Sequence, residues 1–250
     1  MKIEVPGDAG AVAQRAAEII AEEARASVAA RGRFVFAVSG GTTPWVMLRA
    51  LAGFSEKDVP WSSMHIVQVD ERVAPSGDLD RNLTHLRESL LAHAPLPPEH
   101  IYPMPVESAD LTAAATGYAA TLRRIAGAPP VLDLVHLGLG PDGHTASLVP
   151  NDPVLNVRDA DVAITGIYQG RQRMTLTYPI LNRARKILWV VTGAEKRIML
   201  QRLLAGDESI PAGRVHGDDA LVVADSAAAD STAADPSASA LYTQRESYPR

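Results

Sequence analysis

The sequence predicts an α/β protein of three layers, in which a Rossmann-like, largely parallel sheet is flanked by helices. Two observations lead to this fold class. Short apolar segments rich in Val and Ile alternate along the chain with segments of helical periodicity. The apolar segments are also nearly continuous rather than alternating, as strands are when helices cover both faces of a parallel sheet.

The elements follow in chain order. The first helix is expected to begin after Asp8, a good N-cap, and to end at Gly32, which tolerates a left-handed conformation. Two further segments, residues 161–165 and 173–177, predict additional strands near one edge of the sheet. The central strands are expected at residues 33–39, 64–71, 131–140, 186–193 and 220–225, and the later helices at 43–53, 81–92, 109–126 and 194–205.

Length and composition indicate one domain. The chain has 250 residues with 46% hydrophobic content, which is enough for a sizeable core. From Ser226 onward Ala, Ser and Asp dominate, which predicts a terminal helix that frays into a low-complexity tail. We therefore expect a catalytic domain at residues 1–229 and a tail at residues 230–250.

Charge and cysteine content exclude several classes of function. The net charge of -5 argues against a nucleic-acid groove, which needs clustered Lys and Arg. The absence of cysteine excludes disulfides and thiolate metal sites. Because no signal-like or membrane-spanning apolar run is seen, we expect a cytoplasmic protein without a membrane partner.

A glycine-rich turn follows the first central strand, and its sequence is Ser39-Gly40-Gly41-Thr42-Thr43-Pro44. Ligands of open parallel sheets bind at the carboxyl ends of the strands. The exposed N–H groups and hydroxyls of this turn, placed where a helix begins, predict an anion cradle that suits a phosphate. The structural alternative is a tight turn with a Thr N-cap. Without a GK[ST] sequence, the turn does not indicate nucleotide triphosphate binding.

A second polar turn follows the next strand and contains Asp70, Glu71 and Arg72. Strand alternation sends Asp70 and Arg72 to one side and Glu71 to the other. Arg72 is a candidate anion ligand, with Asp70 beside it. The alternative is a simple surface ion pair between Asp70 and Arg72, which is a common arrangement.

The segment LGLGPDGHTASLVP, residues 137–150, carries the most chemistry. His144 is the candidate general base, because imidazole titrates near neutrality, and Asp142 is placed to orient the ring. The N–H groups of Gly140 and Gly143 are candidate donors to an oxyanion. The alternative is a histidine at a helix N-terminus that satisfies backbone groups.

The same segment matches the dinucleotide pattern G-x-G-x-x-G, but a nicotinamide cofactor is not expected. Prolines at positions 150 and 153 interrupt the helix that such a site requires. The other histidines are expected to be structural or solvated, because they lie where no donors converge: His65, His85, His93, His100, His136 and His216.

Basic residues near the later strands could complete an anion site. Arg171 and Arg173 precede one strand, and Lys196 follows the next. Two or three such contacts would complement the nearly two negative charges of a phosphate ester. The alternative is that these are ordinary solvated cations.

Taken together, these motifs resemble the 6-phosphogluconolactonases of the glucosamine-6-phosphate isomerase/deaminase-like superfamily, over about residues 5–229. The DER triplet and the histidine segment are specific, whereas SGGTTP is shared across the superfamily. The chain departs from the family pattern at Arg81, where Ser is usual, and at Val149, where Phe is frequent. The remaining matching positions are Pro75, Asn82, residues 173–177, Asn182, Gly193 and Lys196.

The resemblance implies a carboxylic ester hydrolase that converts 6-phospho-D-glucono-1,5-lactone to 6-phospho-D-gluconate, the second step of the oxidative pentose phosphate pathway. No metal or organic cofactor is expected, and the partner is a small phosphorylated sugar lactone acted on by a monomer or weak homo-oligomer. His144 would be the base and Asp142 its orienting group. The expected substrate and phosphate contacts are Ser39, Gly40, Gly41, Thr42, Asp70, Arg72, Arg173 and Lys196.

Two alternatives stay open. The first is a glucosamine-6-phosphate deaminase or isomerase, whose pattern has DEY and GHIAFNEP where this chain has DER and GHTASLVP. The second is a sugar-phosphate-binding domain without catalysis. Ammonia release from glucosamine 6-phosphate would favour the first, and ligand binding without hydrolysis would favour the second.

Overall fold

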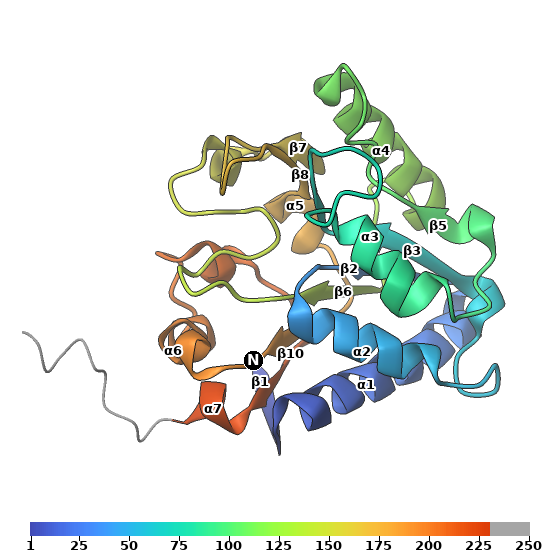
Figure 1. The fold of residues 1–250 in the computed structure, drawn as a ribbon, viewed down its shortest axis with the longest axis vertical. Coiled ribbons are helices and arrows are strands. Elements are labelled where there is room, and N and C mark those ends of the chain that lie inside the picture. The colour runs from blue at the N-terminus through green and yellow to red at the C-terminus, as the bar shows by residue number, and fades with distance from the viewer. Residues whose placement is uncertain (231–250) are drawn as a thin grey trace, which may run out of the picture.

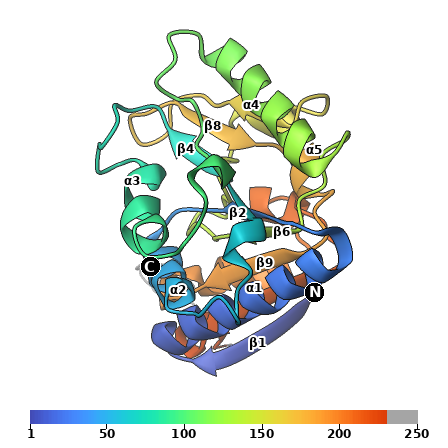
Figure 2. The same ribbon diagram turned by 90° about the vertical axis from the view of Figure 1, so that its right-hand side faces the viewer.

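The computed structural model describes residues 1–230, which form three layers with a seven-stranded sheet in the middle. Every strand pair in this sheet is parallel, in the order β1-β10-β9-β6-β2-β3-β5. Figure 2 shows α1 (Ala9–Arg31) and α2 (Thr42–Ala52) on one side of the sheet and α4 (Leu111–Ala126) on the other. The predicted fold class is confirmed, and the expected tail lies outside the described residues from position 231 onward.

The other elements are placed largely as expected (Figure 1). The strands of the main sheet are β1 (Lys2–Gly7), β2 (Phe34–Val38), β3 (Met64–Gln68), β5 (Ile101–Tyr102), β6 (Leu134–Leu137), β9 (Ile187–Val191) and β10 (Ala220–Asp225). The remaining α-helices are α3 (Asn82–Leu86), α5 (Tyr178–Leu181), α6 (Arg197–Leu204) and α7 (Ser226–Ala229). A wider helical turn, Arg87–Leu91, extends α3 over the rest of the predicted 81–92 segment.

Strand β2 shows why the central strands are apolar throughout. Phe34 and Phe36 pack with α1 and α2 in one hydrophobic core, whereas Val35 and Ala37 pack with α4 in a second core on the opposite face. Successive side chains of a strand point to opposite faces, so both faces of β2 are removed from water. Each large apolar side chain buried in this way contributes about 1.5–3 kcal/mol.

Helix ends follow local chemistry in one case and differ from expectation in another. Asp8 accepts a hydrogen bond from the Ala11 N–H at 2.8 Å, and Gly32 ends α1 with a φ of 73°, as predicted. Helix α2, in contrast, is capped by Gly41, whose φ of 126° suits glycine, and no side chain caps it. The alternative of a Thr N-cap is therefore wrong.

A second, antiparallel sheet lies over the α4 side of the main sheet and corrects two expectations. It consists of β4 (Asp70–Arg72), β8 (Arg173–Leu176) and β7 (Val162–Ile164). Residues 64–71 are therefore two strands rather than one, and β7 and β8 do not extend an edge of the main sheet. The change occurs at Val69, whose N–H donates to the Val38 carbonyl at 2.9 Å while its own carbonyl accepts from the Leu176 N–H at 2.8 Å.

The edge strands β1 and β5 were not expected from the sequence. Strand β5 has only two residues, and β1 mixes Lys2, Glu4 and Pro6 with two exposed apolar residues, Ile3 and Val5. A single neighbouring strand holds each of them, so neither needs a continuous apolar run.

The strand order creates a switch point between β2 and β6. From β2 the chain builds outward through β3 and β5, and from β6 it builds in the other direction through β9 and β10. The loops that leave β2 and β6 therefore diverge at the carboxyl ends of these neighbouring strands. Such a crevice is the usual ligand site of an open α/β sheet.

Candidate active site

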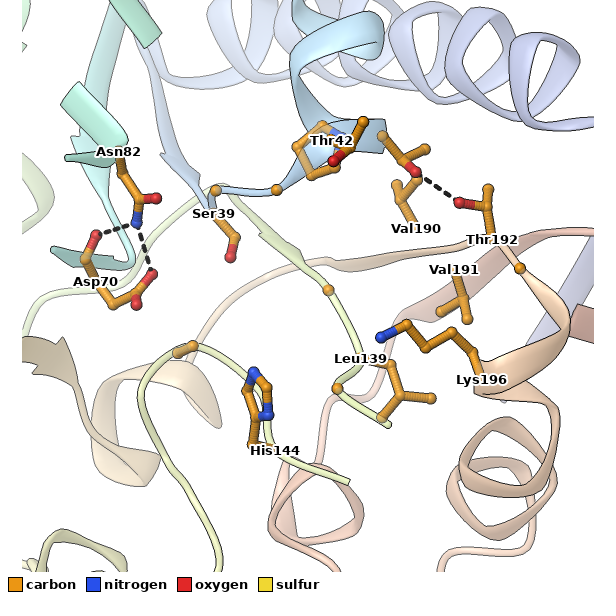
Figure 3. Close-up of a pocket in the computed structure, with 18 of the residues that line it drawn as sticks. Ser39, Thr42, Asp70, Asn82, Leu139, His144, Val190, Val191, Thr192 and Lys196 are labelled. Atoms are coloured by element: carbon orange, nitrogen blue, oxygen red, sulfur yellow. Dashed lines mark hydrogen bonds between the residues drawn. The ribbon is translucent and has the colours of Figure 1, made fainter. Parts of the chain in front are cut away.

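A cavity of about 860 Å³ opens at this switch point. Its walls come from the turn after β2, strand β4, the loop after β6 and the turn after β9. Figure 3 shows the His144 ring and the Lys196 side chain reaching into the space that faces Ser39. The volume suits a small organic ligand, and both polar and apolar residues line it.

The turn after β2 presents backbone donors to the cavity. The N–H groups of Thr42 and Thr43 lie in the first turn of α2, where they have no partner within the helix. The Thr43 hydroxyl lies 2.5 Å from the Thr192 hydroxyl, so it is engaged across the cavity wall rather than free for an anion. A side chain at Gly40 would overlap the Asn82 amide, which explains glycine at that position.

A buried histidine lies beneath this turn. The Ser39 N–H donates to His136 Nδ1 at 3.2 Å, and the His136 side chain is fully buried. Burial lowers the pKa of His136 from its ordinary 6.5 to about 3, so the ring is neutral at physiological pH. His136 therefore supports the turn as a hydrogen-bond acceptor and has no contact with the cavity.

Strand β4 divides its side chains between the cavity and the interior, as predicted. Asp70 and Arg72 line the cavity, whereas Glu71 is completely buried on the other side. The Glu71 carboxylate accepts hydrogen bonds from the N–H groups of Arg72, Asn82 and Leu83, each at 2.8 Å. This carboxylate therefore fixes the start of α3 to β4.

Asn82 connects the two cavity-facing residues of β4. Its amide donates to Asp70 Oδ1 at 3.2 Å, and its oxygen accepts from Arg72 Nη1 at 2.8 Å. Asp70 Oδ2 also accepts from the Ser147 hydroxyl at 2.6 Å. Within residues 1–230 no ion pair joins Asp70 to Arg72, so the interpretation of these two residues as a surface ion pair is wrong.

The histidine loop brings an imidazole and a carboxylate together. His144 Nδ1 lies 2.5 Å from Asp142 Oδ1, which leaves Nε2 as the ring nitrogen available to a ligand. Burial by itself would raise the pKa of Asp142, but the charge of and hydrogen bonds from His144 outweigh it and lower the pKa. No helix begins at His144, so the helix N-terminus alternative fails, and so does the dinucleotide pattern.

The geometry does not support Gly140 and Gly143 as oxyanion donors. The Gly140 N–H donates to the His144 carbonyl at 2.8 Å, and the Gly143 N–H donates to the Gly140 carbonyl at 3.0 Å. Both glycines instead provide space. A Cβ at Gly140 would overlap the His144 ring and lie 2.6 Å from Asp142 Oδ1, and one at Gly143 would lie 2.8 Å from the Ile210 Cβ.

The predicted cations separate into two groups. Arg173 lines the cavity, where its Nη1 donates to Ser147 Oγ at 3.4 Å, and burial lowers its pKa. Lys196 also lines the cavity, and no carboxylate of the described chain forms an ion pair with it. Arg171 forms ion pairs with Asp78 at 3.0 Å and Asp80 at 2.7 Å, so it is not available for an anion in the cavity.

Four residues of the site escaped prediction as ligand or support groups: Asn82, Ser147, Tyr168 and Gln169. Tyr168 donates from its hydroxyl to Asp142 Oδ2 at 3.2 Å. Burial raises the pKa of Tyr168, and the Asp142 charge raises it further, so the phenol stays a donor at neutral pH. The signal for Asn82 and Ser147 was their place inside matching motifs, but no local pattern marks Tyr168 or Gln169.

Two features are absent from the residues that the structure describes. Within residues 1–230 no three His, Asp or Glu side chains are grouped so that they could hold a metal ion. Over the same residues, no helix combines the length and apolar character needed to cross a membrane.

The fold and the cavity define an α/β protein with a His–Asp pair opposite a turn of backbone N–H donors. The chain belongs to the family of glucosamine-6-phosphate isomerases and 6-phosphogluconolactonases, whose model matches residues 7–223. It is 37% identical to a 6-phosphogluconolactonase of Synechocystis sp. over 196 residues, which cover 77% of this chain and 80% of that protein. It is 32% identical to the 6-phosphogluconolactonase of Mycobacterium leprae, over 86% of this chain and 91% of that protein.

Solved structures agree on the fold but not on the branch of the family. A 6-phosphogluconolactonase from Thermotoga maritima superposes with a TM-score of 0.79 and 26% identity, over 89% of this chain and 98% of that one. A monomeric glucosamine-6-phosphate deaminase superposes equally well, with a TM-score of 0.80 over 92% and 99% of the two chains, at 19% identity. The overall fold is therefore common to lactonases and deaminases, and the residues of the cavity distinguish the two reactions.

Proposed function

We propose that this protein hydrolyses 6-phospho-D-glucono-1,5-lactone to 6-phospho-D-gluconate. The observation that carries the proposal is the His144–Asp142 pair, which faces the anion cradle of the Ser39–Thr43 turn across one cavity. The curated relatives named 6-phosphogluconolactonase, at 32–37% identity, support the same activity.

The reaction needs one base that later acts as an acid. His144 Nε2 takes a proton from water as the water oxygen bonds to the lactone carbonyl carbon, and Asp142 stabilises the resulting imidazolium through Nδ1. The tetrahedral intermediate then expels the ring oxygen, which receives the proton from Nε2. Such assistance is worth about 10²- to 10⁴-fold in rate. An oxyanion donor is still required, and it must come from groups other than the N–H of Gly140 and Gly143.

The opposite end of the substrate carries the phosphate. The first-turn N–H groups of α2 offer donors at a helix N-terminus, where the helix dipole also favours an anion. Arg72 enters from β4 on one side, and Lys196 enters from the turn after β9 on the other. Arg173 and Asp70 also line the cavity, where they would contact the sugar hydroxyls.

Ser147 supports the lactonase over the deaminase branch. Its hydroxyl donates to Asp70 at 2.6 Å and contacts Arg173, so it joins the histidine loop to the wall that carries the DER residues. The deaminase pattern GHIAFNEP has Phe at this position, and Phe can make neither hydrogen bond. Ser147 is completely buried, which leaves little space for a larger ring.

A coupled assay with freshly generated 6-phosphogluconolactone tests the proposal. The enzyme-dependent rate is compared with spontaneous hydrolysis at the same pH, and His144→Gln is expected to lower kcat by at least about 100-fold. His216→Gln, which changes an exposed histidine outside the cavity, serves as the control and is expected to keep full activity. Wild-type turnover no faster than the background would refute the proposal.

The same preparation separates the alternatives. Ammonia release from glucosamine 6-phosphate would assign the protein to the deaminase branch, and a raised Tm with 6-phosphogluconate but no turnover would indicate a binding domain.

We further propose that residues 1–229 form the catalytic domain. We infer that the protein acts in the cytoplasm as a monomer or weak homo-oligomer, without nucleic acid. The net charge of -5 supports the last point.

A further inference from the structure

Tyr168 lies in the turn between β7 and β8 and reaches back over the histidine loop. Its backbone pairs with Arg171 across the turn, at 3.0 and 3.3 Å. Arg171 in turn forms the ion pairs with Asp78 and Asp80 that tie this turn to the loop after β4. The Tyr168 side chain is therefore presented from a turn that is anchored at both sides.

The hydroxyl of Tyr168 completes the environment of the Asp142 carboxylate. Asp142 Oδ1 contacts His144 Nδ1, and Oδ2 accepts the Tyr168 hydroxyl at 3.2 Å. With both oxygens held, the carboxylate cannot rotate without losing one hydrogen bond. The orientation of the His144 ring depends on that carboxylate, because Nδ1 has no other partner among the described residues.

The ring of Tyr168 has a second contact. The Arg173 guanidinium lies over its face, 4.9 Å from the ring centre, and the His144 ring meets it edge-on at 5.6 Å. Arg173 Nη2 also donates to Gln169 in the same turn, at 3.2 Å. One side chain thus touches the histidine pair with its hydroxyl end and a buried cavity cation with its ring.

We propose that Tyr168 is a positioning residue for the hydrolysis, holding Asp142 through its hydroxyl and Arg173 through its ring. The proposal rests on the proposed function and adds a residue to it. A purely structural role does not fit, because Tyr168 is partly exposed and belongs to neither hydrophobic core. Its removal should therefore change catalysis more than stability.

The two contacts predict different kinetic effects for two variants. Tyr168→Phe removes only the hydroxyl, so kcat should fall by about 10-fold while KM stays within about twofold, as expected for one hydrogen bond to a charged group. Tyr168→Leu also removes the ring under Arg173, so KM should additionally rise by about fivefold, as expected for one cation–π contact. Tyr102→Phe is the matched control, since its hydroxyl contacts His65 away from the cavity, and it should keep both constants.

Thermal unfolding and NMR separate positioning from a failure of the fold or of the proposed function. All three variants should keep Tm within a few degrees of the wild type. The ring ¹⁵N shifts of His144 should indicate a single tautomer with the proton on Nδ1 in the wild type, and a mixture in Tyr168→Phe, whatever reaction the protein catalyses. Unchanged kcat together with unchanged ¹⁵N shifts in Tyr168→Phe would overturn the proposal. Absence of wild-type lactonase activity with altered ¹⁵N shifts would overturn only the proposed function.

Discussion

Gly140→Ala should separate catalysis from folding more sharply than any change to the histidine itself. A methyl group at this position would lie 2.6 Å from Asp142 Oδ1 and closer still to the His144 ring. Favourable contacts between heavy atoms need about 3.5–4.0 Å, so the imidazole or the carboxylate must move by about 1 Å or more. A misplacement of that size costs on the order of 100-fold in kcat, or about 2.7 kcal/mol in the activation barrier.

The fold should tolerate the same change. Gly140 does not have a positive φ, so alanine can adopt its backbone conformation. Alanine also restricts the unfolded chain, which stabilises by about 0.4–1 kcal/mol and offsets part of the cost of displacing the His144 side chain. We therefore expect the lactonase kcat to fall by about 100-fold while Tm stays within a few degrees of the wild type.

The control is Gly117→Ala in α4, where a methyl group meets nothing within 4 Å. Gly117→Ala should leave kcat unchanged and keep Tm at or slightly above the wild-type value. If Gly140→Ala kept kcat within about threefold of the wild type, the His144–Asp142 geometry would not be what limits the reaction. The assignment of this pair as the catalytic centre would then be wrong.

Three further outcomes are expected. Glu71→Gln should lower the free energy of unfolding in urea by about 3 kcal/mol, because the buried Arg81 loses its buried charged partner and keeps only the exposed Glu107. A loss below about 1 kcal/mol would contradict this prediction. Lys196→Met should raise KM for the lactone by about 10-fold with little change in kcat, because the proposed charged contact to phosphate would be lost. An effect on kcat alone would argue against phosphate binding by Lys196. The unfolded chain protonates His136 below about pH 6.5 but the folded protein only near pH 3, so stability should fall with decreasing pH by up to about 1.4 kcal/mol per unit in that window. In His136→Leu the free energy of unfolding, measured with urea at pH 7 and 4.5, should depend less on pH than in the wild type. An identical pH dependence in the variant and the wild type would refute this prediction.

The parts of the fold that were predictable are those with a local signal. Three features depend only on residues that are close together in the sequence, and each was located correctly: the Asp8 cap, the end of α1 at Gly32 and the continuous apolar run of β2. The passage of the chain from β3 to β4 was not predictable in this way. The apolar pattern continues through Val69. The change of strand is visible only in the hydrogen bonds of Val69, whose N–H pairs with the main sheet and whose carbonyl pairs with the small sheet.

The same distinction applies to the site. The pairing of His144 with Asp142 could be predicted because both residues lie in one short loop. Ser147 contacts Asp70, which lies 77 positions away in the sequence, and Tyr168 contacts Asp142, which lies 26 positions away. No local sequence pattern specifies such contacts. The oxyanion prediction failed for a related reason, since sequence shows which residues are glycines but not where their N–H groups donate.

One residue, Val69, is hydrogen-bonded to both sheets. The N–H of Val69 is bonded to the main sheet, and its carbonyl is bonded to the small one. The cavity thus lies between two sheets, with the turn after β2 and the histidine loop on the main sheet and Arg72 and Arg173 on the small one. A change in the small sheet would therefore move both arginines while leaving the strands that carry the other two walls in place.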